Sequence, residues 1–267
     1  MVTSAIKRRG CRALWRVVRR YPPGRRVYQQ ICRLVHYGQF AVVKTTDARF
    51  AGLLDQFLQP SYDPDFEVIE TIQSRLERTY HGVVRQRTMF QLKTVDIDAS
   101  KCITGIRTPS EGCRLLYNCV RTLAAKNVVE FGTGFGIGTM YLASACTHTG
   151  GHVYTIEPEQ WRVEIAASEL QRHWPDRATV YHGHAEEVFP SLRLSVDFGY
   201  IDAWHSYDVA LHHFELLRDS CLPGGMIVLD DVAGFSTEMN NLWSDLVSSS
   251  DIRNAALWND RMGFIMV

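Results

Sequence analysis

The residues Val128–Thr139 read VVEFGTGFGIGT, and this stretch decides the fold class. Its apolar start predicts a short buried strand, and the residues after Gly136 predict a helix, so the chain has to turn on the glycines between them. A turn of this kind lets a ligand approach the backbone closely because glycine has no Cβ. We therefore expect a bound ligand here. The alternative is that the glycines only allow the helix to pack closely.

The spacing of the glycines separates two classes of ligand. A dinucleotide-binding turn has the pattern GxGxxG. Counting from Gly132 places Ile137 at the last glycine, and counting from Gly134 places Thr139 there. The pattern therefore disfavours a nicotinamide oxidoreductase.

Acidic residues at the ends of the predicted strands indicate the kind of ligand. Glu130 lies where its charge would repel a pyrophosphate but attract the sulfonium and ammonium groups of S-adenosylmethionine. Glu157 ends the next strand, 25 residues after Gly132, a spacing at which an acid accepts hydrogen bonds from ribose hydroxyls. Glu186, after the third strand, either reads an adenine edge or begins a helix as a solvated residue. Together these acids favour an adenosyl cofactor.

Short apolar runs alternate with amphipathic stretches in the second part of the chain. The runs are Asn127–Phe131, His152–Ile156, Thr179–His182, Val196–Ile201 and Met226–Leu229, and helical patterns lie at Gly138–Cys146, Gln160–His173 and Ser206–Cys221. This alternation predicts an α/β fold with a doubly wound, mostly parallel sheet. The last runs, Ala255–Trp258 and Met262–Val267, are joined by the turn residues Asn259 and Asp260 and predict an antiparallel hairpin. We expect a Rossmann-like sheet of seven strands.

Residues 1–100 show helical spacing instead. Their apolar positions are Phe50, Leu53, Leu54 and Phe57, then Val68, Ile69, Ile72 and Leu76, with prolines between such groups. We expect a helical N-terminal extension over residues 1–100, acting as a lid or as a contact in a homodimer. The cofactor-binding domain would then comprise residues 101–267.

The charge is distributed unevenly along the chain. Residues 1–46 hold eleven Lys and Arg and no acid, a net charge of +11, and the remainder holds 18 bases against 29 acids, a net charge of −11. We interpret the basic arm first as helices packed on the core through Leu14, Trp15, Val18 and Tyr21. A membrane-surface contact, a nucleic-acid contact and a transit peptide are the alternatives. From Asp47 to Val267 no basic groove with interleaved aromatic residues is present, so we expect no nucleic-acid partner.

The composition predicts a soluble, cytoplasmic protein. With 267 residues, 46% of them hydrophobic, the chain can bury one α/β core and carry an extension. No apolar run reaches eighteen residues, and Met1–Gln30 lacks the apolar segment of a secretory signal. The seven cysteines include no CxxC pair, which argues against a disulfide framework or a zinc knuckle.

Three aspartates follow two of the predicted parallel strands. Asp202 comes after Val196–Ile201, and Asp230 and Asp231 come after Met226–Leu229. Because the carboxyl ends of parallel strands face one crevice, we expect the three carboxylates to meet there. They would repel one another, so a divalent cation such as Mg²⁺ is the simplest explanation. The alternative is that Asp231 caps the following segment while Asp202 holds the cofactor.

His205, three residues after Asp202, is the candidate general base. Imidazole titrates near neutrality and is suited to removing a hydroxyl proton. A lone histidine at a helix start is the alternative interpretation. We predict no role for four other histidines, because none of them lies at a metal-ligand spacing from a cysteine. These are His182, His184, His212 and His213.

From about Ile106 to Val267 the sequence resembles the catechol and caffeoyl-coenzyme A O-methyltransferase group of class I methyltransferases. It resembles their macrolide and aminocoumarin sugar O-methyltransferase relatives more closely still. The shared segments, in order, are RTPSEG, VVEFGTGFGIGT, IEPE, GHAEEVFP, VDFGYIDAWHSY and PGGMIVLDDV. The cofactor residues that this resemblance implies are Glu130, Gly132, Gly134 and Gly136 for the methionine part, Thr108 and Ser110 near its carboxylate, Glu157 for the ribose, and Ala185, Glu186 and Trp204 around the adenine.

The resemblance also implies a metal and an acceptor. Members of the group carry an Asp after the fourth strand and an Asp-Asn or Asp-Asp pair after the fifth, matched here by Asp202, Asp230 and Asp231. His205 departs from the pattern, because the catechol enzymes have a lysine there. The expected reaction is Mg²⁺-assisted O-methylation of a small molecule with adjacent hydroxyls, a sugar or a phenolic natural product, with His205 and Asp202 as catalytic residues. The alternatives are metal-independent N- or O-methylation and a non-catalytic adenosyl-binding protein with a basic docking arm.

Overall fold

The structure is a computed structural model, and it describes residues 39–59, 61–80, 83–87, 94–98, 103, 108–233 and 236–267. The chain divides into two compact units, residues 1–40 and 41–267, and the candidate site lies in the second. The predicted N-terminal helices that contain Leu14, Trp15, Val18 and Tyr21 lie outside the described residues, as does most of the acid-free segment 1–46.

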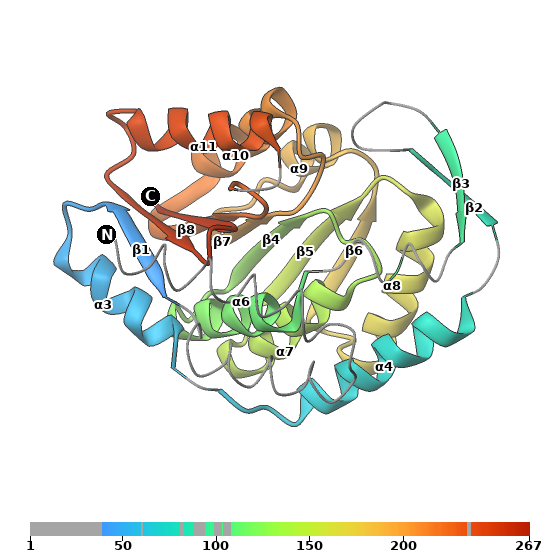
Figure 1. Cartoon of the computed structure of the whole chain (residues 1–267). Helices are drawn as coiled ribbons and strands as arrows, with labels where there is room; N and C mark the ends of the chain where they lie inside the picture. The colour runs from blue at the N-terminus through green and yellow to red at the C-terminus, as the bar shows by residue number, and fades with distance from the viewer. Residues whose placement is uncertain are drawn as a thin grey trace, which may run out of the picture. The chain divides into compact units, whose positions relative to one another are not determined.

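The described strands form an eight-stranded sheet with the order β1-β9-β10-β8-β7-β4-β5-β6 (Figure 1). Their bounds are β1 Phe40–Lys44, β4 Asn127–Phe131, β5 His152–Glu157, β6 Ala178–His182, β7 Val196–Ile201, β8 Cys221–Leu229, β9 Asn254–Trp258 and β10 Met262–Met266. Neighbours from β8 to β6 pair in parallel, whereas β10 runs antiparallel to both β8 and β9. The predicted α/β class, the mostly parallel sheet and the terminal hairpin are therefore confirmed.

The strand count and the helical reading of residues 1–100 need correction. Strand β1 adds an eighth strand at the edge, beside β9, and β2 (Val83–Arg87) and β3 (Thr94–Asp98) form a separate antiparallel pair. The segment around β1 is anchored by residues some 200 positions later, as when the Thr45 hydroxyl donates to Asn254 Oδ1 at 3.0 Å. The sequence around β1 alone does not show this distant partner, so the local pattern could not predict the strand.

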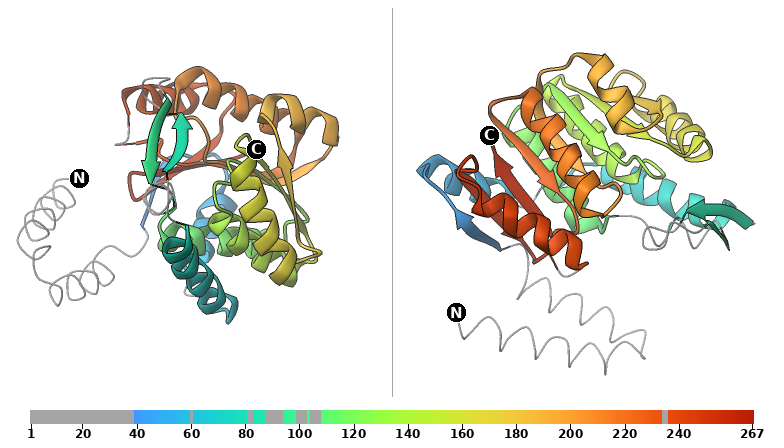
Figure 2. Two further views of the ribbon diagram at one scale, coloured as in Figure 1. Left: turned by 90° about the vertical axis from the view of Figure 1, so that its right-hand side faces the viewer. Right: turned by 90° about the horizontal axis from the view of Figure 1, so that it is seen from above.

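Helices cover both faces of the sheet (Figures 1 and 2). One face carries α6 (Ser110–Thr122), α7 (Ile137–Thr149) and α8 (Gln160–His173), and the other carries α9 (Ala185–Leu192), α10 (Tyr207–Ser220) and α11 (Thr237–Ser248). Two earlier helices, α3 (Ala48–Phe57) and α4 (Asp65–Thr79), contact α6 and α7 respectively. The apolar spacing predicted both, and Phe50, Leu54 and Phe57 of α3 are indeed buried.

Helix α7 shows how the sequence specifies this layering. Its residues from Ile137 to Cys146 are buried apart from Gly138, so the helix is apolar on nearly all sides. A helix of this kind has to be covered by neighbours on both sides. It contacts β5 on the sheet side and α4 and α6 besides, which explains why residues before the sheet domain are required to complete its core.

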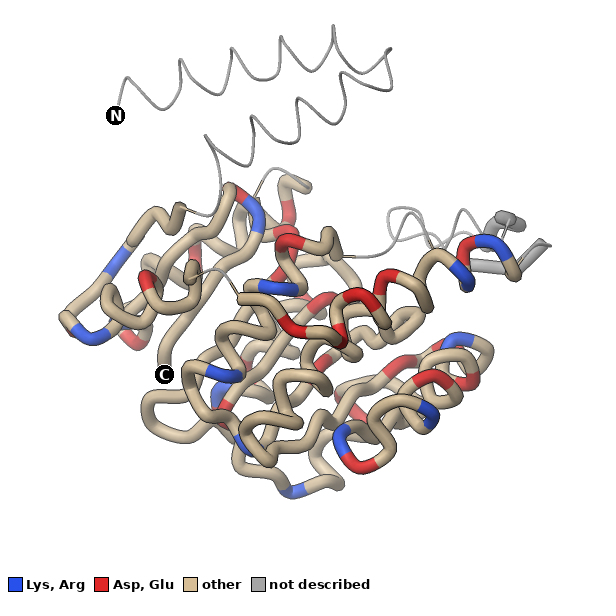
Figure 3. Tube along the Cα trace, turned by 90° about the horizontal axis from the view of Figure 1, so that it is seen from below, with Lys and Arg blue, Asp and Glu red and all other residues tan. Residues whose placement is uncertain are grey.

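Charged residues of both signs lie along the described part of the chain. On the side seen in Figure 3, Lys and Arg positions are interspersed with Asp and Glu positions along the described chain. None of the described helices combines the length and the apolar character that a bilayer-spanning segment needs.

Candidate functional site

The carboxyl ends of β4, β5, β7 and β8 form one edge of the sheet, where the candidate site lies. Backbone hydrogen bonds continue the ladder beyond the strands: Gly132 N–H donates to Ile156 O at 3.0 Å, and Asp202 N–H to Phe131 O at 2.9 Å. Asp230 N–H donates to a β7 carbonyl at 2.9 Å in the same way. These bonds hold the residues that follow each strand in one row.

The turn after β4 requires glycine at two positions for steric reasons. Gly132 has a φ of +98°, and a Cβ there would lie 2.2 Å from the carbonyl oxygen of Asp202. Gly136 has a φ of +80°, and a Cβ there would lie 3.0 Å from the Cβ of Ala166 in α8. The glycines thus allow the turn to pack against β7 and α8, which makes close packing part of their role whatever else they do.

Glu157 lies directly against this turn. Its Oε2 accepts a hydrogen bond from Gly134 N–H at 2.8 Å, and its Oε1 accepts one from Glu159 N–H at 3.1 Å. Arg162 forms an ion pair with the same Oε1 at 3.4 Å. Burial raises the pKa of Glu157, and the charge of Arg162 opposes that rise. Glu157, which the sequence predicts to bind the ribose, is therefore held in position by the glycine turn.

Glu130 is buried beneath the first turn of α7 and is 1% exposed. Its Oε2 accepts hydrogen bonds from the hydroxyls of Thr139 and Thr155. Burial raises its pKa to about 7, although these two hydrogen bonds lower it. In this arrangement Glu130 supports the turn from below, whereas the sequence analysis had placed it beside the cofactor's charges.

The predicted residues at the start of α6 lie at the same edge. The hydroxyl of Thr108 lies 2.9 Å from Tyr200 Oη and donates to Asp202 Oδ2 at 3.0 Å. Ser110 is the first residue of α6 and is half-buried. Thr108 thus belongs to the aspartate group of the site.

The residues predicted around the adenine come from two other strand ends. Ala185 is buried at the start of α9, and beside it Glu186 Oε2 lies 3.4 Å from His213 Nε2. Trp204 follows β7 with a φ of +41°. The buried His213 also stacks edge-on against Phe131, with 5.1 Å between ring centroids, so it has a packing role that the sequence analysis did not assign.

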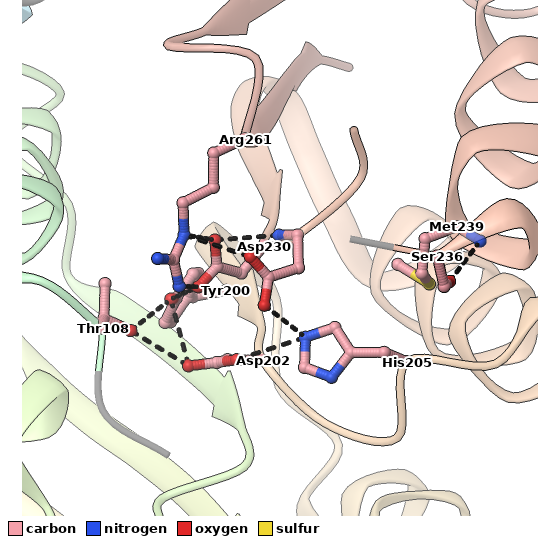
Figure 4. Close-up of polar contacts among 9 residues, drawn as sticks. Thr108, Tyr200, Asp202, His205, Asp230, Ser236, Met239 and Arg261 are labelled. Atoms are coloured by element: carbon pink, nitrogen blue, oxygen red, sulfur yellow. Dashed lines mark hydrogen bonds and ion pairs between the residues drawn. The ribbon is translucent and has the colours of Figure 1, made fainter. Parts of the chain in front are cut away.

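Asp202 and Asp230 lie close to the guanidinium of Arg261 (Figure 4), and Asp231 lies beside the same guanidinium. Arg261 donates from Nε to Asp230 Oδ1 at 2.7 Å and from Nη2 to Asp230 Oδ2 at 2.6 Å. Its Nε also lies 3.2 Å from Asp231 Oδ1. Tyr200 Oη lies 3.3 Å from Asp202 Oδ2 and 3.2 Å from Asp230 Oδ2, so its single proton is shared between the two carboxylates.

The carboxylate of Asp230 is already hydrogen-bonded on both oxygens by donors of this chain. Besides the two bonds from Arg261, it accepts Asp231 N–H on Oδ1 at 2.8 Å and the Tyr200 hydroxyl on Oδ2. A carboxylate has about four acceptor positions; Arg261 and Asp231 N–H use three of them, and the Tyr200 hydroxyl, whose one proton is shared with Asp202, faces the fourth. Among the described residues, no group of three or more His, Cys, Asp or Glu side chains is arranged to hold a metal ion. The predicted metal set therefore does not fit a divalent cation as it stands.

His205 lies between the two other carboxylates. Its Nε2 is 3.6 Å from Asp202 Oδ1 and 3.5 Å from Asp231 Oδ2, and its side chain is 5% exposed (Figure 4). Burial lowers the pKa of His205, although the charge of Asp230 raises it. Burial raises the pKa of Asp231 to about 6, and it raises that of Asp202 well above the usual range; the charge of Asp230 adds to both. The imidazole thus lies between two carboxylates, and burial lowers its pKa.

Backbone strain is concentrated at this edge. Trp204 and Asp231, each in the loop after a strand, have φ values of +41° and +52°. Non-glycine residues rarely occupy this region, and they cluster at binding and catalytic sites. The two loops that carry His205 and Asp231 are therefore held in a conformation that local sequence preference does not favour.

The sequence analysis missed Arg261, Tyr200 and Arg162. Arg261 follows a predicted hairpin turn, where a basic residue is ordinarily exposed. The signal that could have found it is the register: β10 pairs with β8 so that Gly263 lies opposite Leu229, which brings Arg261 opposite Asp231. Tyr200 is one residue before the end of β7. Nothing in its local pattern distinguishes it from a core tyrosine.

Comparison with known proteins shows that this chain is similar to methyltransferases. Residues 129–232 match a family model described as a methyltransferase domain. A putative O-methyltransferase of Mycobacterium sp. (strain JLS) is 34% identical over 147 residues, which cover 53% of this chain and 61% of that protein. The O-methyltransferase hkm8 of Aspergillus hancockii is 24% identical over 139 residues, covering 51% of this chain and 55% of hkm8. The chain thus matches less than two thirds of the length of these relatives.

Solved structures show the same fold. Cofactor-bound Rv0187 from MTB superposes with a TM-score of 0.59 at 19% identity, over 81% of this chain and 95% of that one. TomG of Streptomyces achromogenes, an O-methyltransferase in complex with SAM, gives 0.56 at 17% identity, over 84% and 99%. An O-methyltransferase from Bacillus cereus in complex with SAH gives 0.55 at 21% identity, over 82% and 96%. The fold is therefore the Rossmann-like methyltransferase fold.

Proposed function

We propose that this chain is an S-adenosylmethionine-dependent O-methyltransferase acting on a small molecule. The observation that carries the proposal is the position of His205, which lies in the row of strand ends that also holds the glycine turn and Glu157. The proposed cofactor site and the candidate base would thus lie at the same edge of the sheet in a methyltransferase fold. The matches to a methyltransferase domain and to O-methyltransferases support the same reaction.

The cofactor would be held by the residues that the resemblance implies. Glu157 retains acceptor capacity on Oε2 beyond its bond from Gly134 and would accept from a ribose hydroxyl. The backbone of the glycine turn would face the methionine part. Ser110, Ala185, Glu186 and Trp204 would complete the site from the other strand ends, as the sequence predicts.

The chemistry proposed for this chain is proton removal. S-adenosylmethionine supplies a methyl group on a sulfonium, which is transferred to the acceptor oxygen. His205, whose pKa burial lowers, would accept the hydroxyl proton as the oxygen–carbon bond forms and the sulfur–carbon bond breaks. The products are a methyl ether, S-adenosylhomocysteine and a protonated imidazole. Asp202 and Asp231, 3.5 to 3.6 Å from Nε2, would stabilise that imidazolium.

Metal assistance has no part in this proposal. The sequence predicted Mg²⁺ at Asp202, Asp230 and Asp231, but both oxygens of Asp230 already accept hydrogen bonds from Arg261, and Asp231 N–H and Tyr200 also face them. The resemblance continues to favour a sugar or a phenolic natural product as the acceptor. We also retain the proposal that residues 1–100 act as a lid or a dimer contact, which sedimentation of the full chain would test.

The test combines binding with turnover. Isothermal titration of the full chain with S-adenosylhomocysteine should detect binding, and mass spectrometry should detect a methyl ether with S-adenosylmethionine and one member of a panel of catechols, monophenols and sugars. Methylation of amines alone in a parallel panel would favour the N-methyltransferase alternative. No cofactor binding and no product would refute the proposal.

A further inference from the structure

We infer that Arg261 is the permanent cation of the aspartate cluster, and that the cluster neither binds nor needs a divalent metal ion. The cluster is Asp202, Asp230 and Asp231, which by themselves would form an oxygen-rich site suited to Mg²⁺. The inference deepens the proposed function and rests on it only for its activity readout. It departs from what the sequence and the family resemblance imply.

Arg261 binds both carboxylate oxygens of Asp230. Two parallel hydrogen bonds from Nε and Nη2 of Arg261, at 2.7 and 2.6 Å, match the geometry in which a guanidinium binds a carboxylate most strongly. The Asp230 side chain is fully buried, whereas that of Arg261 is 28% exposed. A metal ion would have to displace the guanidinium from a carboxylate that water does not reach.

The backbone that carries Arg261 is fixed to the same loop. Arg261 O accepts a hydrogen bond from Val232 N–H at 2.9 Å, and Arg261 N–H donates to Trp258 O at 2.9 Å. The turn before it has positive φ values at both Asn259 and Asp260, each 52°, as a tight hairpin requires. Val232, the residue after Asp231, is thus joined to Arg261, the residue before β10, so Arg261 cannot leave Asp230 by a rigid movement of the hairpin alone.

Charge explains why the pair is stable. Burial disfavours the charge of Arg261, yet the hydrogen bonds and the charge of Asp230 raise the pKa of Arg261 above its usual value. The same guanidinium lowers the pKa of Asp202 and of Asp231. One residue of this chain therefore partly neutralises three carboxylates, which is the role that a metal ion would otherwise have.

Asp202 and Asp231, which Arg261 does not saturate, both lie near His205. The imidazole of His205 is within 3.6 Å of both Asp202 and Asp231 (Figure 4). A metal selects acceptors with two adjacent oxygens because it ligates both, whereas a site without one needs a single hydroxyl beside His205. Monohydroxy acceptors should therefore be used as readily as diols.

The test that needs no turnover is a titration with Mn²⁺, followed by electron paramagnetic resonance, on the full chain saturated with S-adenosylhomocysteine. The wild type should bind Mn²⁺ at least about tenfold more weakly than Arg261→Met, because that variant removes a positive charge within a few ångströms of the carboxylates. Arg253→Met, at an exposed position before β9, is the matched control and should bind as the wild type does. Asp230→Asn in the Arg261→Met background should abolish the new site.

Wild-type protein that binds one Mn²⁺ tightly at this cluster would overturn the inference, and so would equal affinity in the wild type and a folded Arg261→Met. The Mn²⁺ titration of the wild type alone can overturn the inference, even if Arg261→Met does not fold. In turnover, EDTA should leave the wild-type rate unchanged, and loss of the rate with recovery on Mg²⁺ would also overturn the inference. Absence of methyl transfer with any acceptor would instead count against the proposed function, since the titration is independent of it.

Discussion

The backbone N–H of Gly134 donates a hydrogen bond of 2.8 Å to Oε2 of Glu157 and so connects the turn after β4 with the end of β5. The two residues are 23 positions apart in the chain, yet the parallel pairing of β4 with β5 brings them together. A ligand that bridges the turn and the carboxylate would therefore meet a preformed site. Two consequences can be measured separately, one on cofactor affinity and one on the turn itself.

Glu157→Gln should weaken the binding of S-adenosylhomocysteine by about ten- to a hundredfold, the cost of a lost hydrogen bond to a charged group. The amide keeps an oxygen that can accept from Gly134, so the turn should persist. Isothermal titration measures the affinity. Glu164→Gln, an exposed position in α8, is the matched control and should bind as the wild type does. Equal affinities in the two variants would remove Glu157 from the cofactor site.

Gly132→Ala should lower the free energy of unfolding by more than about 2 kcal/mol, because the new Cβ combines a strained backbone with a steric clash. The clash is with the carbonyl oxygen of Asp202, 2.2 Å from the ideal Cβ position. Urea unfolding without ligand measures this. Gly52→Ala, in an exposed position of α3 with nothing within 4 Å of its Cβ, should leave stability unchanged or raise it. A wild-type unfolding curve for Gly132→Ala would show that the turn can rearrange.

Much of the parallel sheet could be predicted from the sequence because the signal there is local. The predicted strand Val196–Ile201 and helix Gln160–His173 match the structure to the residue. Strands buried on both faces are continuous apolar runs, and the helices between them show a period of 3.6 residues. Strand β8 begins earlier than predicted, at Cys221, since Pro223 and two glycines obscure its first half.

The edge strand and the cation of the cluster could not be predicted in the same way. Val42 and Val43 are adjacent and both nearly half-exposed, at 46% and 45%, so β1 lacks the alternation of a half-buried strand. The partner of Arg261 lies 31 residues away in the chain. Only the antiparallel register between β8 and β10 brings the two together. Without Arg261, the three aspartates by themselves predicted a metal site.

Glu130→Gln should change how stability depends on pH. Burial raises the pKa of Glu130 from 4.5 to about 7, against the hydrogen bonds from Thr139 and Thr155, and the charge of Glu157 adds to the rise. A carboxyl group whose pKa is raised on folding stabilises fully below its unfolded pKa, and that contribution is lost as the pH rises through the folded pKa. Between pH 5 and 8.5 the wild type should therefore lose roughly 2 to 3 kcal/mol relative to Glu130→Gln.

Urea unfolding of the ligand-free protein across this pH range measures the difference. Glu187→Gln, at an exposed position in α9, serves as the control, and its difference from the wild type should stay within about 0.5 kcal/mol throughout. If the difference between the wild type and Glu130→Gln were also flat, the carboxylate would be ionised and fully compensated in the folded state.

His205→Asn should lower kcat by about a hundred- to ten-thousandfold, the usual contribution of a positioned general base. Asparagine is smaller and remains polar beside Asp202 and Asp231, so the fold should survive, which far-ultraviolet circular dichroism would verify. The affinity for S-adenosylhomocysteine should change by less than about threefold, because a base acts in the transition state and not in cofactor binding. This split between kcat and affinity separates a catalytic role from a structural one.

His212→Asn, on the exposed side of α10, should retain wild-type kcat. A kcat for His205→Asn equal to that of the His212 variant would mean that the acceptor loses its proton to another group or to water.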